Sequence, residues 1–221
     1  MDTMINEQPI EEAKNEVLRK IGRNMLIFQQ MEQYLKVLVS TSNISGYGSE
    51  LKAKQASQIE SVQTQTMGQL VGQYIENNNP EKNNKSDEPD DLKDVYVSIS
   101  FSIETNEEAH NQQKKFMASL VEERNNLVHH FLPTFNPTSI NSCVDVQKRL
   151  DTQADKVRRT ITRLKATLAA FNKARKTFAD FSQSQEFSMA GLSMDARARH
   201  PITLPDGQVH SNTVWLKSVI D

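Results

Sequence analysis

Apolar residues recur at helical spacing over four long stretches of the chain. In the first stretch, a stripe from Ile21 to Val39 advances by steps of about four and three residues. Further apolar side chains widen this face beyond one stripe, which is typical of a central, largely buried helix. The predicted helices cover about residues 11–40, 49–76, 106–132 and 142–182, and Pro133 ends the third of them.

Residues 95–103 follow a different pattern, because apolar side chains alternate there with tyrosine and serine. Strict alternation predicts a strand, or an extended segment that lies on the helices. A single strand forms no sheet, so we expect it to need a partner. The C-terminal tail or a second subunit could supply that partner.

Two polar stretches interrupt the helical pattern. Residues 77–92 are rich in asparagine and acidic side chains, which predicts a loop or a disordered segment. In the tail, residues 205–207 (Pro-Asp-Gly) predict a small hairpin, and a short helix carrying Trp215 is expected after it. We therefore expect an all-α fold, with one helical-bundle domain over 1–186 that includes the β-like segment, and a tail over 187–221.

The composition narrows the classes of function. The 221 residues carry a formal net charge of -2, so the whole chain shows no basic excess that would favour nucleic acid. One cysteine, Cys143, excludes an intramolecular disulfide, a zinc finger and an iron–sulfur cluster built from this chain alone. No apolar run is long enough for a membrane span, and the N-terminus lacks a signal-peptide core. We therefore expect a cytoplasmic protein without metal or other cofactor.

The segment 120–132 combines an apolar stripe with unusual polar residues. Arg124 lies within the stripe, and a guanidinium there must be paired or must border a cleft, because an unpaired buried charge is strongly destabilising. Asn125 and His129 are four residues apart, so the amide can orient the imidazole. Arg124 and His129 are separated by about 140° on an ideal α-helix, so we expect them to share a groove edge rather than one face.

An arginine and a histidine without a metal are suited to the cleavage of RNA phosphodiesters. Histidine can transfer protons near neutral pH. Arginine can bind a phosphate with two hydrogen bonds and stabilise the charge that develops on it. RNA carries its own nucleophile, the 2′-hydroxyl, so this chemistry requires no metal-activated water.

The run Arg124-Asn125-x-x-x-His129 resembles the Arg-x4-6-His motif, with a polar residue after the arginine, of the HEPN superfamily. The resemblance covers roughly residues 11–182. It implies a helical bundle and a metal-independent ribonuclease of a toxin–antitoxin or defence system, whose motifs face each other in a homodimer. It also implies that Arg124 and His129 are catalytic and that Asn125 supports them. The implied partners are RNA and an antitoxin or regulatory protein.

Two further residues are candidates for supporting roles. His130 follows His129 and could assist it, although side chains of adjacent residues diverge by about 100° on a helix and cannot easily chelate one metal. Glu32 occupies an apolar-stripe position in the first helix. It could form a buried ion pair with Arg124 and fix its orientation, or it could pair with Lys36 on the surface.

The fourth predicted helix is locally basic. Residues 144–176 hold ten basic and three acidic side chains, in contrast to the nearly neutral whole chain. This face could follow an RNA backbone, or it could simply be solvated. The candidate RNA-binding residues are Arg158, Arg159, Arg163 and Lys165.

Two other classes of function compete with the ribonuclease. The first is a non-catalytic interaction or regulatory module of the same fold, in which the motif is structural. The second is a DNA-binding regulator that uses the basic helix. It is disfavoured because the sequence shows no helix-turn-helix with a short central turn and no basic total charge.

Overall fold

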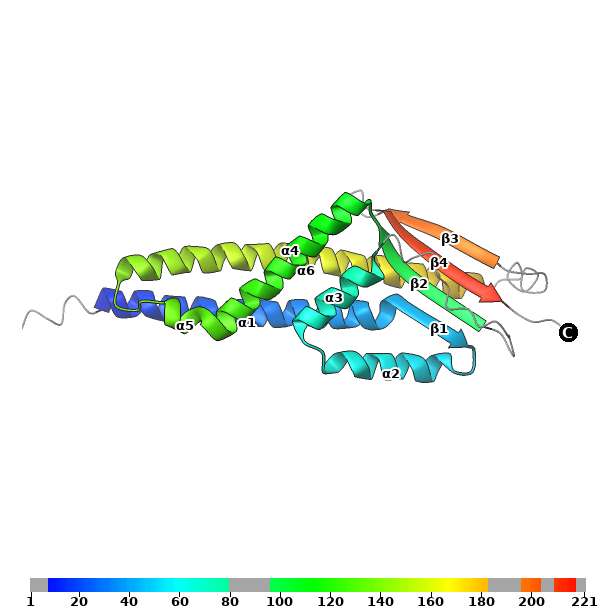
Figure 1. Ribbon diagram of the computed structural model, residues 1–221, viewed down its shortest axis with the longest axis horizontal. Coiled ribbons are helices and arrows are strands. Elements are labelled where there is room, and N and C mark those ends of the chain that lie inside the picture. Colours follow the sequence, from blue (N-terminus) through cyan, green and yellow to red (C-terminus); the bar gives the residue numbers. More distant parts are fainter. Residues whose placement is uncertain (1–7, 80–95, 183–195, 204–208, 218–221) are drawn as a thin grey trace, which may run out of the picture. The chain divides into compact units, whose positions relative to one another are not determined.

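A computed structural model describes residues 8–79, 96–182, 196–203 and 209–217 (Figure 1). These residues are mostly helical, as the sequence predicts. The helices are α1 (Gln8–Ser42), α2 (Leu51–Gln63), α3 (Met67–Asn77), α4 (Glu107–Asn125), α5 (Phe131–Thr134) and α6 (Ile140–Ser182). The strands are β1 (Asn43–Tyr47), β2 (Tyr96–Glu104), β3 (Ala196–Thr203) and β4 (Val209–Lys217).

The chain divides into two compact units, to which α1, α4 and α6 each contribute. Unit 1 comprises Met1–Gln33 and Phe116–Arg163, and unit 2 comprises Tyr34–Lys115 and Leu164–Asp221. The predicted acidic loop from residue 80 onward, the predicted domain boundary at 186/187 and the turn at 205–207 lie outside the described residues. None of the described helices has an apolar stretch long enough to cross a membrane.

In unit 1, polar contacts join α1 to α6 beside an apolar core. Lys20 and Arg23 both pair with Asp151, at 2.6 Å and 2.9 Å. The hydrogen bond from Lys20, followed by that from Arg23, lowers the pKa of the Asp151 carboxyl. Asn24 is almost fully buried and donates to the Leu150 carbonyl oxygen at 2.8 Å. These contacts fix the register of α1 against the part of α6 that carries the candidate site.

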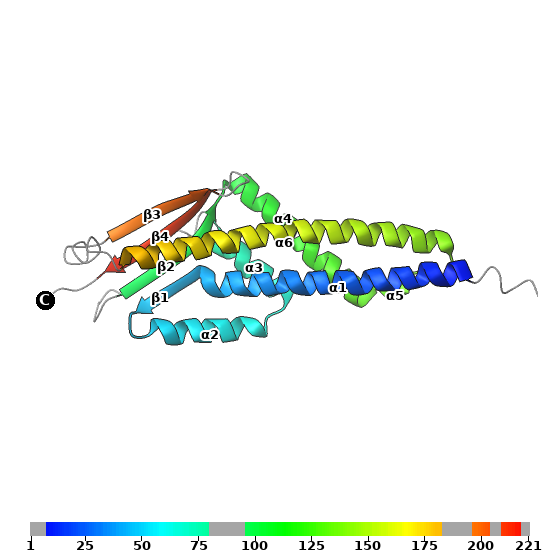
Figure 2. The ribbon, with the colours of Figure 1, turned by 180° about the vertical axis from the view of Figure 1, so that it is seen from behind.

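Unit 2 contains a four-stranded antiparallel sheet with the order β1-β2-β4-β3. The second half of α6 lies against this sheet (Figure 2), where Phe171 stacks on Phe101 with ring centroids 5.3 Å apart. Arg175 lies over the same Phe101 ring, and burial lowers the pKa of its guanidinium. At the end of α3, Asn78 accepts a hydrogen bond from the Ile103 amide at 2.8 Å. This bond ties α3 to β2.

The sheet is larger than the sequence predicts. The partners that β2 requires come from the tail, as β4, and from β1, whose residues look like a helix-ending loop in the sequence. The short helix expected around Trp215 is wrong, because Val209–Lys217 forms a strand that pairs with both β2 and β3. Backbone pairing on two sides satisfies amide groups that a short isolated helix would leave exposed.

The single helix predicted over 49–76 is also wrong. The structure has α2 and α3 instead, with a break at 64–66. Thr66 accepts a hydrogen bond from the Gln69 amide, and the Gln69 side chain accepts one from the Thr66 amide. This capping box starts a new helix at Met67 and stabilises it by about 1 kcal/mol.

Candidate functional site

A π-helical turn, η1 (Asn126–His130), interrupts the helix that carries the motif. The sequence predicts one uninterrupted helix here, whereas the structure has α4, η1 and α5 in succession. Pro133 supplies a physical reason for the difference. Its ring has no N–H for the His129 carbonyl four residues earlier and would clash with that carbonyl in a regular α-helix. A wider turn relieves this conflict.

The π-helical turn changes the expected geometry of the motif. Residues five apart lie nearly above one another in such a turn, as residues four apart do in an α-helix. Most of the chain from Arg124 to His129 runs through η1. These two residues therefore lie closer to a common face than the 140° expected for an ideal α-helix, which strengthens the geometric case for a shared site.

Arg124 is half-buried at the end of α4. Its guanidinium donates from Nη1 to Oδ1 of Asn125 at 3.2 Å. Within the described residues Arg124 has no ion pair, so the ion pair predicted with Glu32 is not formed. Glu32 is itself half-buried on α1. Asn125, predicted to orient His129, instead holds the arginine in this structure.

His129 and His130 are both exposed in η1. Their ring centroids lie 6.2 Å apart with the ring planes 63° from each other. Two exposed imidazoles so close together provide one group to accept a proton and another to donate one. No described set of three His, Cys, Asp or Glu side chains has an arrangement that could hold a metal ion.

A cleft of about 850 Å³ opens beside these residues, entirely within unit 1. One wall belongs to the α4–η1–α5 segment and the other to α6. The first wall is formed by Glu123, Asn126, Leu127, His130, Phe131 and Thr134. The second wall includes Val146, Lys148, Arg149, Leu150, Gln153 and Lys156.

The two walls are joined by an ion pair. Lys156 on α6 donates to the Glu123 carboxylate at 2.6 Å and to the Ser119 hydroxyl at 3.0 Å. This pair neutralises one base of the cleft. Lys148 and Arg149 are exposed and, within the described part of the chain, form no ion pair. The cleft therefore keeps a cationic edge on α6.

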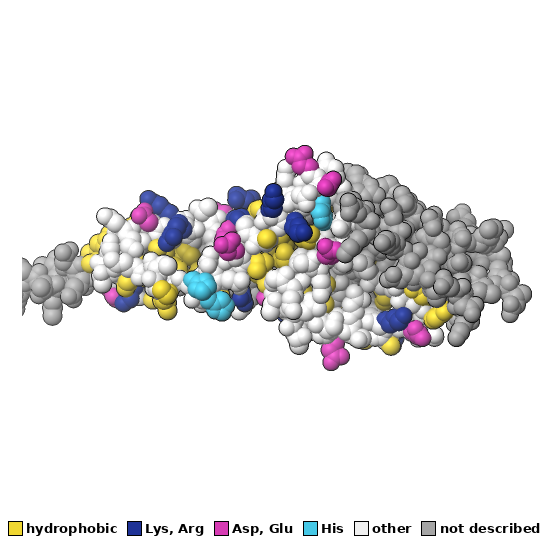
Figure 3. Space-filling view, in the orientation of Figure 1, with side chains coloured by type: hydrophobic (Ala, Val, Ile, Leu, Met, Phe, Trp, Pro, Cys, Tyr) yellow, Lys and Arg dark blue, Asp and Glu magenta, His cyan; other side chains and the backbone are white. Residues whose placement is uncertain are grey.

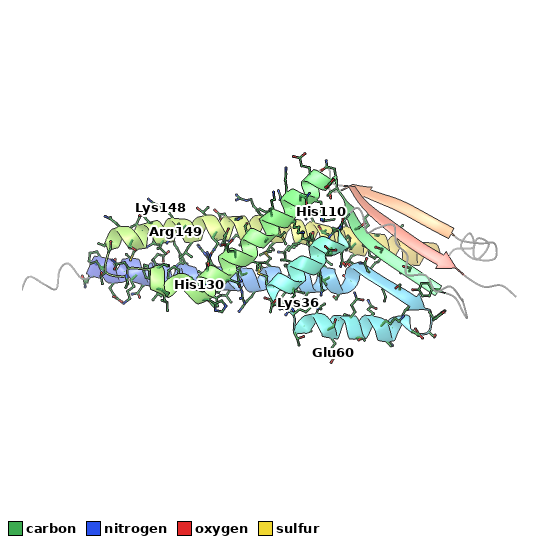
Figure 4. The ribbon with its side chains drawn as sticks, in the orientation of Figure 1. Lys36, Glu60, His110, His130, Lys148 and Arg149 are labelled. Atoms are coloured by element: carbon green, nitrogen blue, oxygen red, sulfur yellow. The ribbon has the colours of Figure 1, made fainter. Side chains whose placement is uncertain are left out.

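The two edges of the cleft carry different types of side chain, a histidine on one and basic residues on the other. Figure 4 places His130 on one wall and Lys148 and Arg149 on the other. Figure 3 shows histidine, apolar and basic side chains on this face of the molecule, with acidic side chains among them. An apolar floor with a few convergent polar groups is typical of a small-molecule or substrate site.

The structure brings only part of the predicted site into the cleft. His130 lines it, whereas Arg124 and Asn125 at the end of α4, and His129 in η1, are not part of its walls. Sequence reasoning missed Lys148 and Arg149 as site residues. The sequence does indicate their position, because Arg149 and Lys156 are seven residues apart and fall on one helical face, with Lys148 beside them.

The predicted RNA-binding residues lie elsewhere on α6. Arg158, Arg159 and Arg163 are exposed in unit 1, and Arg158 pairs with Asp155 at 3.3 Å. Lys165 belongs to unit 2, where its ammonium lies over the Tyr34 ring. None of the four lines the cleft.

Comparison of the chain with protein-family models, curated proteins and solved structures finds no match.

Proposed function

We propose that this protein is a metal-independent endoribonuclease of the HEPN type, acting in the cytoplasm as a homodimer within a bacterial toxin or defence system. The resemblance of residues 124–129 to the family motif supports the class, the homodimer and the setting. The surroundings of the motif support RNA as the substrate.

The observation that carries the proposal is the composition of one surface in unit 1. There, the half-buried Arg124 ends α4, the exposed His129 and His130 lie in the π-helical turn that follows, and His130 lines a cleft whose far edge holds Lys148 and Arg149. Two proton-transfer groups, a guanidinium and a cationic edge are what the cleavage of a phosphodiester by its own 2′-hydroxyl requires.

The reaction follows from these roles. His129 removes the proton from the 2′-hydroxyl, whose oxygen attacks the phosphorus while the bond from phosphorus to the 5′-oxygen breaks. Either His130 or His129 of the second subunit then protonates the leaving oxygen. Arg124 stabilises the charge on the phosphate, and Asn125 positions that guanidinium. The products are a 2′,3′-cyclic phosphate and a 5′-hydroxyl end.

The test is cleavage of mixed cellular RNA, including transfer and messenger RNA, by the purified protein in EDTA. We expect cleavage with 2′,3′-cyclic phosphate ends, and its loss in Arg124→Ala and His129→Ala. Arg19→Ala is the matched control, because Arg19 is an exposed arginine on α1 that pairs with Glu16. The helical content of each variant is checked by circular dichroism.

Two outcomes would contradict the proposal. If the wild-type protein cleaves none of these RNAs, the protein is not a ribonuclease of this kind. If both folded variants keep full cleavage, the activity comes from another site or from a contaminant.

A second candidate, a non-catalytic interaction module, is favoured by one observation. Val128 and Leu132 beside the histidines are large apolar side chains with exposed fractions of 41% and 74%. Exposed apolar groups next to a motif fit a surface that binds another protein. This function predicts that Leu132→Asp weakens a complex isolated with the protein, whereas His129→Ala leaves it intact and no RNA is cleaved.

A further inference from the structure

The cleft in unit 1 has the size and the two-sided chemistry of a ligand site. Its volume of about 850 Å³ is in the range of sites for small molecules and cofactors. Nearly buried or half-buried apolar side chains from both walls form its floor, among them Leu127, Phe131 and Leu150. A basic edge and a histidine edge border this floor.

The basic edge is suited to a phosphate group. Lys148 and Arg149 are adjacent on α6, both line the cleft and both are exposed. Lys156 is already bound to Glu123, so these two are the cleft cations that remain available among the described residues. An ammonium and a guanidinium together can bind several phosphate oxygens.

The opposite part of the cleft is suited to a planar base. Phe131 is half-buried, and its ring packs on Phe135 with centroids 5.2 Å apart, which restricts the orientation of the ring. Aromatic rings of this kind stack nucleobases with little regard to sequence. The exposed Asn126 amide also lines the cleft and its side chain makes no hydrogen bond within the described residues, so it can hydrogen-bond a base edge.

We propose that this cleft binds one nucleotide of single-stranded RNA, with its phosphate on Lys148 and Arg149 and its base on Phe131. The inference rests on the proposed function in one respect, namely that the bound nucleotide belongs to an RNA substrate. Binding in the cleft requires no cleavage, so a free mononucleotide fills the same site. The scissile phosphate of the bound strand then lies toward the π-helical turn that carries His129 and His130.

The test measures binding of adenosine 5′-monophosphate by equilibrium dialysis in EDTA at low salt, with adenosine and inorganic phosphate as partial probes. The double variant Lys148→Ala/Arg149→Ala is expected to weaken mononucleotide binding at least about tenfold, because it removes two charge-assisted contacts. The matched control is Lys114→Ala/Lys115→Ala, an adjacent pair of exposed bases on α4 outside the cleft. This control is expected to bind like the wild type.

A second variant separates the base from the phosphate. Phe131→Leu keeps an apolar side chain but removes the stacking surface. It is expected to weaken binding of adenosine 5′-monophosphate while leaving the weaker binding of inorganic phosphate unchanged. A higher salt concentration is expected to weaken phosphate binding in the wild type.

The outcomes separate this inference from the proposed function. Mononucleotide binding that both double variants retain, or no binding at all, would overturn the nucleotide site even if the protein cleaves RNA. Binding that depends on Lys148 and Arg149 in a protein that cleaves no RNA would support the site and overturn the nuclease. A 2′-O-methyl RNA oligonucleotide, which cannot be cleaved, is expected to compete with the mononucleotide.

Discussion

The Arg124 guanidinium donates a hydrogen bond from Nη1 to Oδ1 of the neighbouring Asn125, at 3.2 Å. Both residues lie at the end of α4, where the π-helical turn begins. The asparagine therefore holds the arginine by a neutral contact that restricts its rotation and leaves its charge uncompensated. A phosphate can then compete for the guanidinium without displacing a carboxylate.

This contact makes the side chain at position 125 a test of the proposed arginine role. Asn125→Ala is expected to lower the rate of RNA cleavage at least about tenfold, since a hydrogen bond to a charged group is worth about 1.5 kcal/mol or more and about 1.4 kcal/mol corresponds to a tenfold change in rate. Asn125→Asp is expected to lower the cleavage rate further than Asn125→Ala does, because its carboxylate neutralises Arg124 and repels the RNA. Cleavage rates of a labelled RNA under single-turnover conditions measure both effects.

The control for the added charge is Asn111→Asp, at an exposed position on the same helix. It is expected to cleave like the wild type. An Asn125→Asp protein as active as the wild type would show that the charge of Arg124 does not act on the substrate.

The stability of unit 1 is expected to depend on Asn24. Its side chain is 1% exposed and donates to the Leu150 carbonyl at 2.8 Å and to the Gln153 side chain at 2.9 Å. Asn24→Ala leaves buried acceptors with fewer partners and is expected to lower the free energy of unfolding by about 1–3 kcal/mol. Chemical denaturation measures the change.

Gln29→Ala serves as the control for Asn24, because Gln29 is exposed on the same helix. Its effect is expected to stay within about 0.5 kcal/mol. An equal loss of unfolding free energy in Asn24→Ala and Gln29→Ala would show that the buried Asn24 amide makes no special contribution to stability.

Unit 2 is expected to lose stability at high pH because of Tyr74. Burial raises the pKa of this phenol to about 12, although hydrogen bonds with Thr167 and Gln113 act in the opposite direction. In the unfolded chain the phenol loses its proton near pH 10. Between these values the unfolded state binds fewer protons than the folded state, so stability falls as the pH rises.

The measurement is denaturation of the wild type and of Tyr74→Phe at about pH 9 and about pH 11. The variant is expected to show a smaller fall between the two conditions, because its ring has no proton to lose. An equal fall in stability in the wild type and in Tyr74→Phe would show that Tyr74 does not cause the loss of stability at high pH.

Much of the helical architecture follows from the sequence, because apolar periodicity records which face of each helix is buried. The stripe through Phe28 and Leu35 in α1 is an example, as both side chains are buried. Residues 95–103 illustrate the limit. Their alternation predicts β2, but its partners β1 and β4 come from distant segments, and pairing between distant segments leaves little local signal.

The candidate site is likewise predicted from the sequence only in part. The sequence identifies Arg124, Asn125 and His129 through their types and spacing, yet it predicts a regular helix where Pro133 and its neighbours give a π-helical turn. It also does not place Lys148 and Arg149 at a cleft. Their neighbours in the cleft come from a different helix, and only the packing of α6 against the α4–η1–α5 segment brings the two walls together.

The most direct test of the central claim is cleavage of one labelled RNA in EDTA, beside the same RNA with a single 2′-deoxy nucleotide at the mapped cleavage position. We predict that the first RNA is cut at this position to a 2′,3′-cyclic phosphate, that the second is not cut there, and that His129→Ala cuts neither. Continued cleavage at the 2′-deoxy position would contradict attack by the 2′-hydroxyl and with it the proposed mechanism.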